Sequence, residues 1–172
     1  MDNKVDKKII KTTWFKKVDK AIRGWMRKFG LKALRISIGL VFLWFGFIKF
    51  FPGLSPAHDL AINTISIVTF GVIPDSSLIT GLAVWEVMIG LGLLTGKFMR
   101  LTLLLLFLQM PGTFLPVFLF PEIVFVSIPF VPTIEGQYIF KNLVLISAGI
   151  VLGGFLEKRP TGGIQEPPAD PD

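Results

Sequence analysis

The chain has 172 residues, of which 52% are hydrophobic and only 17% are charged, and its mean hydropathy is +0.66. An ordinary soluble domain carries about 25% charged residues, so this composition excludes a soluble protein with one core and indicates an integral membrane protein. The chain has no cysteine and a single histidine, His58. This excludes disulfides, thiolate metal sites, thiol redox chemistry and a histidine-based metal site.

The net charge of +6 is concentrated at the start of the chain. Twelve of the eighteen Lys and Arg residues lie between Lys4 and Arg35, before or at the edge of the first apolar run. A basic segment next to a membrane span is typical of an anchor on anionic lipid. We therefore predict contact with anionic lipids, and no nucleic-acid partner.

Residues 1–30 form a predicted cytoplasmic arm with the pattern of an amphipathic helix. Lysines and arginines occupy one side of the helix predicted over residues 12–29, and Gly30 allows a bend before the first span. A helix with Trp at its apolar edge and cations opposite is typical of one that lies in the headgroup region. The apolar side carries Trp14, Phe15, Val18, Ala21, Ile22, Trp25, Met26 and Phe29.

Four apolar segments follow within a predicted transmembrane domain of residues 31–157. They run over residues 34–51, 78–94, 98–120 and 138–156, and each approaches the ~20 residues that a membrane-crossing helix needs. The predicted fold class is an all-α integral membrane protein, an antiparallel four-transmembrane-helix bundle with an N-terminal interfacial helix. Residues 158–172 are rich in proline, glycine and acid, which predicts a disordered cytoplasmic tail.

The links between the spans predict the orientation of the chain. The links over residues 52–77 and 121–137 contain no Lys or Arg, whereas the link after the second span carries Lys97 and Arg100. By the positive-inside rule both termini are cytoplasmic, in a bacterial plasma (inner) membrane.

The two outer links have different patterns. A short amphipathic helix is predicted over residues 58–71. The second link is apolar but contains Pro121, Pro129 and Pro132, so we expect it to fold back over the outer mouth of the bundle.

Each span contributes a polar side chain at the middle or the outer half of the predicted membrane. Glu86 is the only charge in the second span and lies about 12 Å along it, near the midplane. Burial favours an ion network of Lys49, Glu86 and Lys141, with Gln109 and Asn142 completing the hydrogen bonds. This cluster carries two positive charges against one negative, so it would accept an anion or another acid such as Glu135 or Asp75.

Three interpretations of this polar cluster remain open. It is a set of structural hydrogen bonds between helices, a site for a ligand such as a quinone headgroup, or a path for ions or protons. In the structural case the two lysines extend to the headgroups, and a neutral Glu86 bonds Trp85, Gln109 or a carbonyl.

Small and kinking residues accompany the polar ones. Glycines in the first two spans predict close packing on the faces that carry Lys49 and Glu86. Pro111, Gly112 and Pro116 predict a kink or interruption beside Gln109. The packing glycines are Gly39, Gly46, Gly90, Gly92 and Gly96.

Three stretches resemble the DoxX-like family of small four-span bacterial membrane proteins. They are LRISIGLVFLWFGFIKFFPG in the first span, WEVMIGLGLLTGKFMR in the second and EGQYIFKNLVLISAGIVL in the fourth, and they cover most of residues 34–156. The resemblance implies a four-helix bundle of the inner membrane and motif positions at Lys49, Glu86, Lys141 and Asn142. Some members of the family are associated with thiosulfate or quinone oxidation, others with redox-stress complexes or, more distantly, with receptor assembly.

From these observations we expect an accessory component of a membrane redox or stress-response system that binds a quinone or lipid at the polar cluster. The other candidates are a small proton-coupled transporter and a membrane-protein assembly factor. No phosphate loop, nucleophile motif or metal motif is present, so no catalytic or metal-binding residue is predicted and the chain is not expected to be an enzyme. Membrane redox proteins are the expected protein partners, and the sequence does not specify an oligomeric state.

Overall fold

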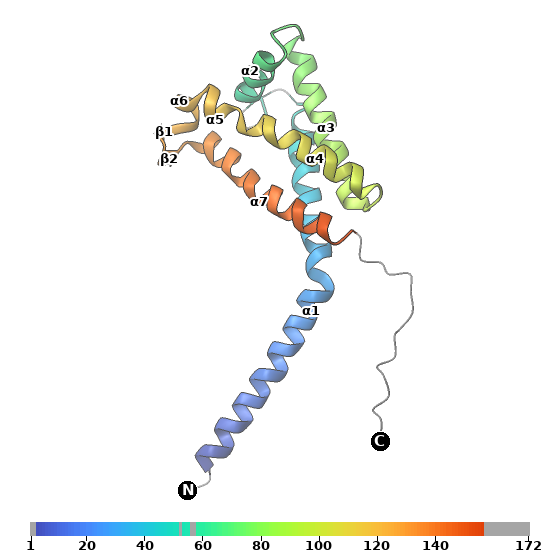
Figure 1. The fold of residues 1–172 in the computed structure, drawn as a ribbon, viewed down its shortest axis with the longest axis vertical. Helices are drawn as coiled ribbons and strands as arrows, with labels where there is room; N and C mark the ends of the chain where they lie inside the picture. Colours follow the sequence, from blue (N-terminus) through green and yellow to red (C-terminus); the bar gives the residue numbers. More distant parts are fainter. Residues whose placement is uncertain (1–2, 52, 56–57, 157–172) are drawn as a thin grey trace, which may run out of the picture.

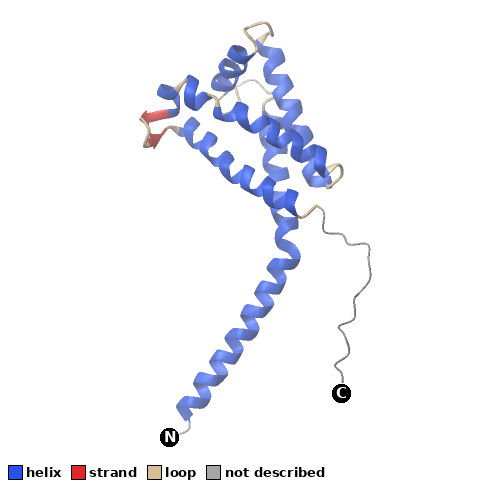
Figure 2. Ribbon diagram, viewed as in Figure 1, coloured by secondary structure: helices blue, strands red, loops and turns tan. Residues whose placement is uncertain are grey.

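The computed structural model describes residues 3–51, 53–55 and 58–156, and its regular structure is almost entirely helical (Figure 2). The predicted tail, residues 158–172, lies outside the described residues. Four helices are long and apolar enough to cross a membrane, which confirms the prediction of a multi-pass helical membrane protein. These spans are Trp14–Ile48, Asp75–Thr95, Met99–Leu119 and Ile134–Gly154.

The first helix, α1 (Asn3–Ile48), is a single unbroken element of 46 residues that projects far beyond the other helices (Figure 1). At ~1.5 Å per residue it is about 69 Å long, roughly twice the hydrocarbon thickness of a bilayer. The chain has no proline before Pro52, and the helix continues through Gly30, where the sequence allowed a bend. The position of the arm at the membrane surface therefore stays a prediction.

The second and third helices are α2 (His58–Val68) and α3 (Asp75–Thr95). Helix α2 is the short helix predicted in the first outer link. Helix α3 ends at Gly96, whose φ of 70° is left-handed. The N–H of Gly96 donates to the Gly92 carbonyl at 2.9 Å. A glycine in this conformation is a common end for a helix, because no side chain clashes with the last turn.

Two glycines allow the last part of α1 and the helix α3 to pack closely. A Cβ atom built on Gly46 would lie 2.9 Å from the Val87 nitrogen, and one built on Gly90 would lie 2.5 Å from the Leu43 nitrogen. These distances leave no room for a side chain between the two backbones. The predicted close packing on these faces is present, and Gly46 lies directly against the Cβ atom of Glu86, at 2.8 Å from the built atom.

The third span consists of α4 (Met99–Phe114) followed by the short α5 (Pro116–Leu119). Pro111 lies inside α4, which continues through it, and the interruption falls later, at Leu115. Pro116 has no N–H to bond the Gly112 carbonyl, so the regular hydrogen-bonding pattern stops there.

The second outer link contains α6 (Pro121–Val124) and two short antiparallel strands, β1 (Phe125–Ser127) and β2 (Val131–Pro132). The strands lie at one edge of the molecule (Figure 2). Val124 and Phe125 are buried against Leu60 of α2 and Ile139, so this link packs on α2 and on the last helix.

The last helix, α7 (Ile134–Gly154), begins at Thr133, whose hydroxyl accepts a hydrogen bond of 3.1 Å from the Gly136 nitrogen. Such a cap satisfies one of the free N–H groups at the start of a helix. The main core lies where α1, α3, α4 and α7 meet. Its buried members are Ile38, Phe42, Ile89, Leu93, Leu103, Leu106, Met110, Ala148 and Leu152.

Candidate ligand site in the membrane domain

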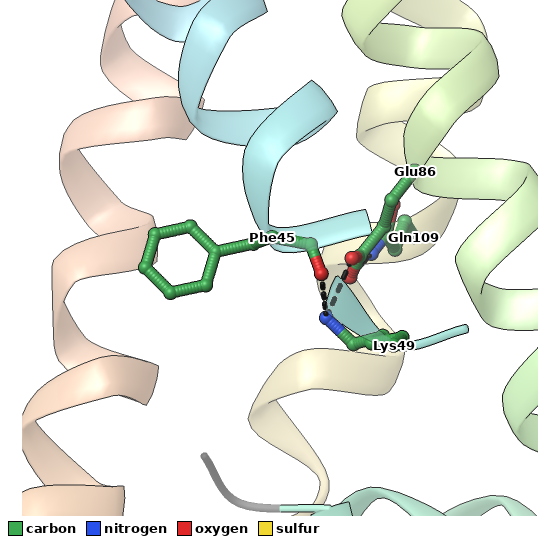
Figure 3. A network of polar contacts seen from close by, with 4 residues as sticks. All are labelled: Phe45, Lys49, Glu86 and Gln109. Carbon is green, nitrogen blue, oxygen red and sulfur yellow. Dashed lines mark hydrogen bonds and ion pairs between the residues drawn. The ribbon is translucent and has the colours of Figure 1, made fainter. Parts of the chain in front are cut away.

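Glu86 lies on the face of α3 that packs against α1, and it is only 8% exposed. Its Oε2 atom lies 2.6 Å from the Nζ atom of Lys49, and both side chains are about nine-tenths buried (Figure 3). Because an unpaired charge in this environment is costly, the ion pair explains how both residues are accommodated between apolar helices.

Lys49 reaches Glu86 from the end of α1. It follows the last helical residue, and its ammonium group also donates to the Phe45 carbonyl at 3.2 Å (Figure 3). That carbonyl belongs to the last turn of α1, where the helix dipole favours a positive charge. Lys49 therefore serves both the end of its own helix and the carboxylate of the next span.

Gln109 of α4 completes the contacts of the carboxylate. Its Nε2 atom donates to Glu86 Oε1 at 2.9 Å, so the two carboxylate oxygens are bonded from two different helices. The amide oxygen has to point away, because two acceptors would repel one another. That buried oxygen has no hydrogen-bond partner among the described residues. Lys49, Glu86 and Gln109 are called the polar triad below.

Trp85, the neighbour of Glu86, does not bond the carboxylate. Its indole N–H donates to the Leu105 carbonyl on α4 at 3.1 Å. This bond connects α3 and α4 one residue from Glu86, and it helps to fix where the carboxylate meets Gln109.

Lys141 is placed differently from the predicted ion network. Its side chain is exposed, its Nζ atom lies 4.0 Å from the ring centroid of Tyr138, and it forms no ion pair with a described residue. A cation over an aromatic face is a favourable contact that needs no carboxylate. The predicted network is therefore present only at Lys49, Glu86 and Gln109.

All five predicted residues nevertheless line one cavity of about 730 Å³ between α1, α2, α3, α4 and α7. Glu135 also lines it and Asp75 does not, so the charged side chains on its wall are two lysines and two glutamates. The predicted excess of positive charge is thus offset. The remaining lining residues are Val41, Phe42, Phe45, Leu60, Ala61, Thr64, Ile65, Val68, Leu82, Gly112, Thr113, Leu115, Pro116, Tyr138, Ile139, Val144 and Leu145.

The cavity is covered by α2 and is open beside exposed apolar side chains. Val41, Val68 and Val144 line it and are 41%, 53% and 67% exposed. Of the second outer link, residues 121–137, Glu135 alone lines it, so the expectation that this link folds back over the outer mouth of the bundle stays a prediction. Val41 on α1 and Val144 on α7 belong to helices long and apolar enough to cross a membrane, where an exposed valine faces hydrocarbon, so the opening beside them is accessible from the lipid.

Three polar lining residues were not predicted from the sequence: Thr64, Thr113 and Tyr138. Thr113 follows Gln109 by one helical turn and Tyr138 precedes Lys141 by three residues, so helical spacing could have identified both. Thr64 is buried on α2 and bonds the Leu60 carbonyl of its own helix, and nothing in the sequence distinguishes it.

Within the part of the chain that the structure describes, no three His, Cys, Asp or Glu side chains are grouped as a metal site. Comparison of the chain with protein-family models, with curated proteins and with solved structures found no match. The resemblance to DoxX-like proteins therefore stays a prediction.

Proposed function

We propose that the protein binds a membrane-soluble amphiphile, a quinone or a lipid, in the central cavity, with the headgroup at the polar triad. In this proposal it serves as an accessory component of a membrane redox or stress-response system. The observation that carries the proposal is a cavity with a hydrogen-bonded polar end and an opening among lipid-exposed valines. Ligand sites are commonly apolar cavities of roughly 300–1,000 Å³ with a few convergent polar groups, and this cavity fits that range.

The hydrogen-bonding capacity of the polar triad supports a headgroup that both donates and accepts. An ammonium group has three hydrogens, and Lys49 uses two of them, for the Phe45 carbonyl and for Glu86. The Gln109 oxygen is a buried acceptor with no described partner. A hydroxyl group or the reduced form of a quinone matches this combination of one donor and one acceptor, and the carbonyl oxygen of an oxidised quinone can accept from Lys49.

The proposed arrangement in the membrane is an antiparallel four-helix bundle with both termini in the cytoplasm of a bacterial cell. It is supported by the absence of Lys and Arg from residues 52–77 and 121–137 and by the basic residues at the opposite end. The first half of α1 carries exposed aromatic side chains, including Trp14, Phe15 and Trp25, which supports contact with the anionic headgroup region.

Mass spectrometry of the small molecules that co-purify with the protein in mild detergent tests the proposal. Glu86→Gln removes the negative charge of the triad, and Glu122→Gln makes the same change at an exposed residue outside the cavity. Glu86 holds the Lys49 and Gln109 side chains in place, so its loss should lower the affinity for the headgroup by about tenfold or more. We expect a quinone or lipid to be retained by the wild type and by Glu122→Gln, and to be depleted in Glu86→Gln.

Identical small-molecule profiles from three folded proteins would contradict the binding site and leave the triad with a structural role. Proton or solute flux in proteoliposomes that depends on Glu86 would instead favour the transporter.

The exposed apolar side of the arm favours one further candidate, an assembly factor for other membrane proteins. Trp14, Phe15, Ile22, Trp25 and Met26 are each more than half exposed. Deletion of residues 1–30 tests this role: a client protein that co-purifies with the full chain should be lost, and unchanged recovery of the client counts against it.

A further inference from the structure

A second cavity, of about 660 Å³, is lined by residues of α1, α3–α4 and the end of α7. The turn between α3 and α4 and the end of α7 lie at the opposite end of the membrane domain from the strands (Figure 1). The cavity is formed where α1 passes the end of α3, the start of α4 and the end of α7. Its lining contains two cations, Lys32 and Arg35, and otherwise Gly96 and apolar side chains such as Met99 and Leu152. Gly96 is ten residues, about 15 Å, beyond Glu86 along α3, so this cavity is separate from the polar triad.

Arg35 is positioned by the end of α3. A Cβ atom built on Gly96 would overlap the Nη1 atom of Arg35, so the guanidinium group lies directly on the bare glycine backbone. The left-handed φ of 70° also makes glycine the favoured residue there. The carbonyl end of a helix attracts a cation, so the backbone of α3 favours the guanidinium at this place.

The guanidinium has no acid to neutralise it among the described residues. Arg35 is partly buried, yet it forms no ion pair or side-chain hydrogen bond with any residue that the structure describes. The segments that build this end, residues 20–42, 87–110 and 143–156, contain no Asp or Glu. A partly buried guanidinium with five free N–H donors is a strong site for an anion.

We propose that this second cavity binds the phosphate group of an anionic phospholipid. The planar guanidinium of Arg35 can bond two phosphate oxygens at once, and Lys32 adds a second positive charge at the cavity. The apolar part of the wall, with Met99, Leu152 and Leu156, suits the glycerol and the first carbons of the acyl chains. A free phosphate ion would leave this apolar wall without a partner, which favours the lipid.

Native mass spectrometry of the full chain in mild detergent, titrated with short-chain phosphatidylglycerol, tests this proposal. Arg35→Gln should lower the affinity of the tight site by about tenfold or more, because a charged, two-pronged contact is lost. Lys32→Gln should lower it by about two- to fivefold. The matched control is Lys20→Gln, an exposed arm residue with the same change of charge, and it should change the affinity less than twofold.

Two further titrations identify the molecule that occupies the second cavity. Phosphatidylcholine should bind more weakly than phosphatidylglycerol, because its positive headgroup would lie beside Lys32 and Arg35. Glycerol phosphate without acyl chains should fail to displace the lipid at equal concentration. Displacement by glycerol phosphate would make this a site for a soluble anion and would overturn the lipid assignment.

The same titration can exclude the proposal even if one variant does not fold. Arg35→Lys keeps the positive charge but loses the planar group that bonds two phosphate oxygens at once, and it should bind phosphatidylglycerol more weakly than the wild type. If Lys20→Gln and Lys32→Gln lose affinity for phosphatidylglycerol equally, the lipid is attracted by the overall positive charge, and the proposed site is overturned. Binding that appears only in Glu157→Gln, a change in the residue that follows Leu156, would identify a carboxylate of the chain itself as the occupant.

Discussion

Glu86 shows how a single carboxylate can be accommodated between membrane-crossing helices. Lys49 and Gln109 bond its two oxygens from either side, at 2.6 and 2.9 Å, and little of the side chain is exposed. In an apolar environment such a pair is close to neutral in free energy, whereas breaking it is strongly unfavourable. The two predictions that follow use this asymmetry.

The first prediction compares two substitutions of Glu86. Glu86→Gln keeps an acceptor for Lys49 and Gln109, whereas Glu86→Lys places a second ammonium group next to Lys49 and adds a third lysine to the cavity. We expect Glu86→Lys to lose about 3–5 kcal/mol of stability, and Glu86→Gln clearly less. The yield of folded protein in membranes measures the difference, and equal yields would contradict a buried ion pair.

The second prediction concerns removal of one or both members of the Lys49–Glu86 ion pair. Lys49→Met leaves Glu86 with Gln109 alone and should cost about 3–5 kcal/mol, whereas Lys49→Met combined with Glu86→Met should lie within about 1–2 kcal/mol of the wild type. Unfolding in detergent measures all three variants. Additive losses in the double variant would show that the two side chains are not coupled.

Much of the site was predictable at this scale, because ionisable residues within apolar spans are conspicuous. Counting residues placed Glu86 and Gln109 near the middle of the membrane and Lys49 near the outer end of the first span. The direction of the Lys141 side chain could not be predicted, because its contact with Tyr138 depends on rotamers rather than on position in the sequence. The Gln109 oxygen, which has no partner among the residues that the structure describes, is likewise a consequence of how three helices meet.

At the scale of helices, the packing of α1 on α3 fixes where the polar triad forms. Gly90→Ala would force its Cβ atom against the backbone of Leu43, whereas Gly81→Ala, in the same helix, has nothing within 4 Å of the added atom. We expect Gly90→Ala to lose about 1–3 kcal/mol and Gly81→Ala to be neutral or to gain up to about 1 kcal/mol. Melting temperatures of the two variants in one detergent provide the comparison. Equal melting temperatures would show that the helices tolerate separation.

Helices were predictable from apolar runs, but their ends were not. The spans α3 and α7 begin three and four residues earlier than predicted, because their first turns are partly polar and were counted as links. Pro111, Gly112 and Pro116 were expected to kink or interrupt the helix beside Gln109; α4 continues through Pro111 and Gly112, and the interruption lies at Leu115, directly before Pro116. Hydropathy identifies the buried length of a helix, whereas caps and backbone hydrogen bonds determine where it ends.

At the scale of the molecule, the orientation in the membrane can be tested cleanly because the chain has no cysteine. Ser77→Cys and Lys97→Cys place single thiols at exposed positions near the two ends of α3. A membrane-impermeant maleimide should label Ser77→Cys in intact cells and should label Lys97→Cys only after permeabilisation. The wild type serves as the unlabelled control, and the reverse pattern would invert the proposed topology.

The central cavity itself was beyond what the sequence could predict. Its cover is α2, a helix expected only to lie on the outer surface, and its opening depends on the separation of α1 and α7. Counting along one span gives depth, but it does not give the volume between spans. The placement of five predicted residues on one cavity wall therefore adds information that no single segment contains.

The most direct test of the proposed ligand site is to block its opening without changing the polar triad. Val144 lines the cavity and is 67% exposed, whereas its neighbour Leu143 is 53% exposed and does not line it. The measurement is the amount of quinone or lipid retained by purified Val144→Trp and Leu143→Trp, relative to the wild type. We predict that Val144→Trp loses the retained molecule and Leu143→Trp keeps it; equal retention by the two folded variants would contradict a ligand in this cavity.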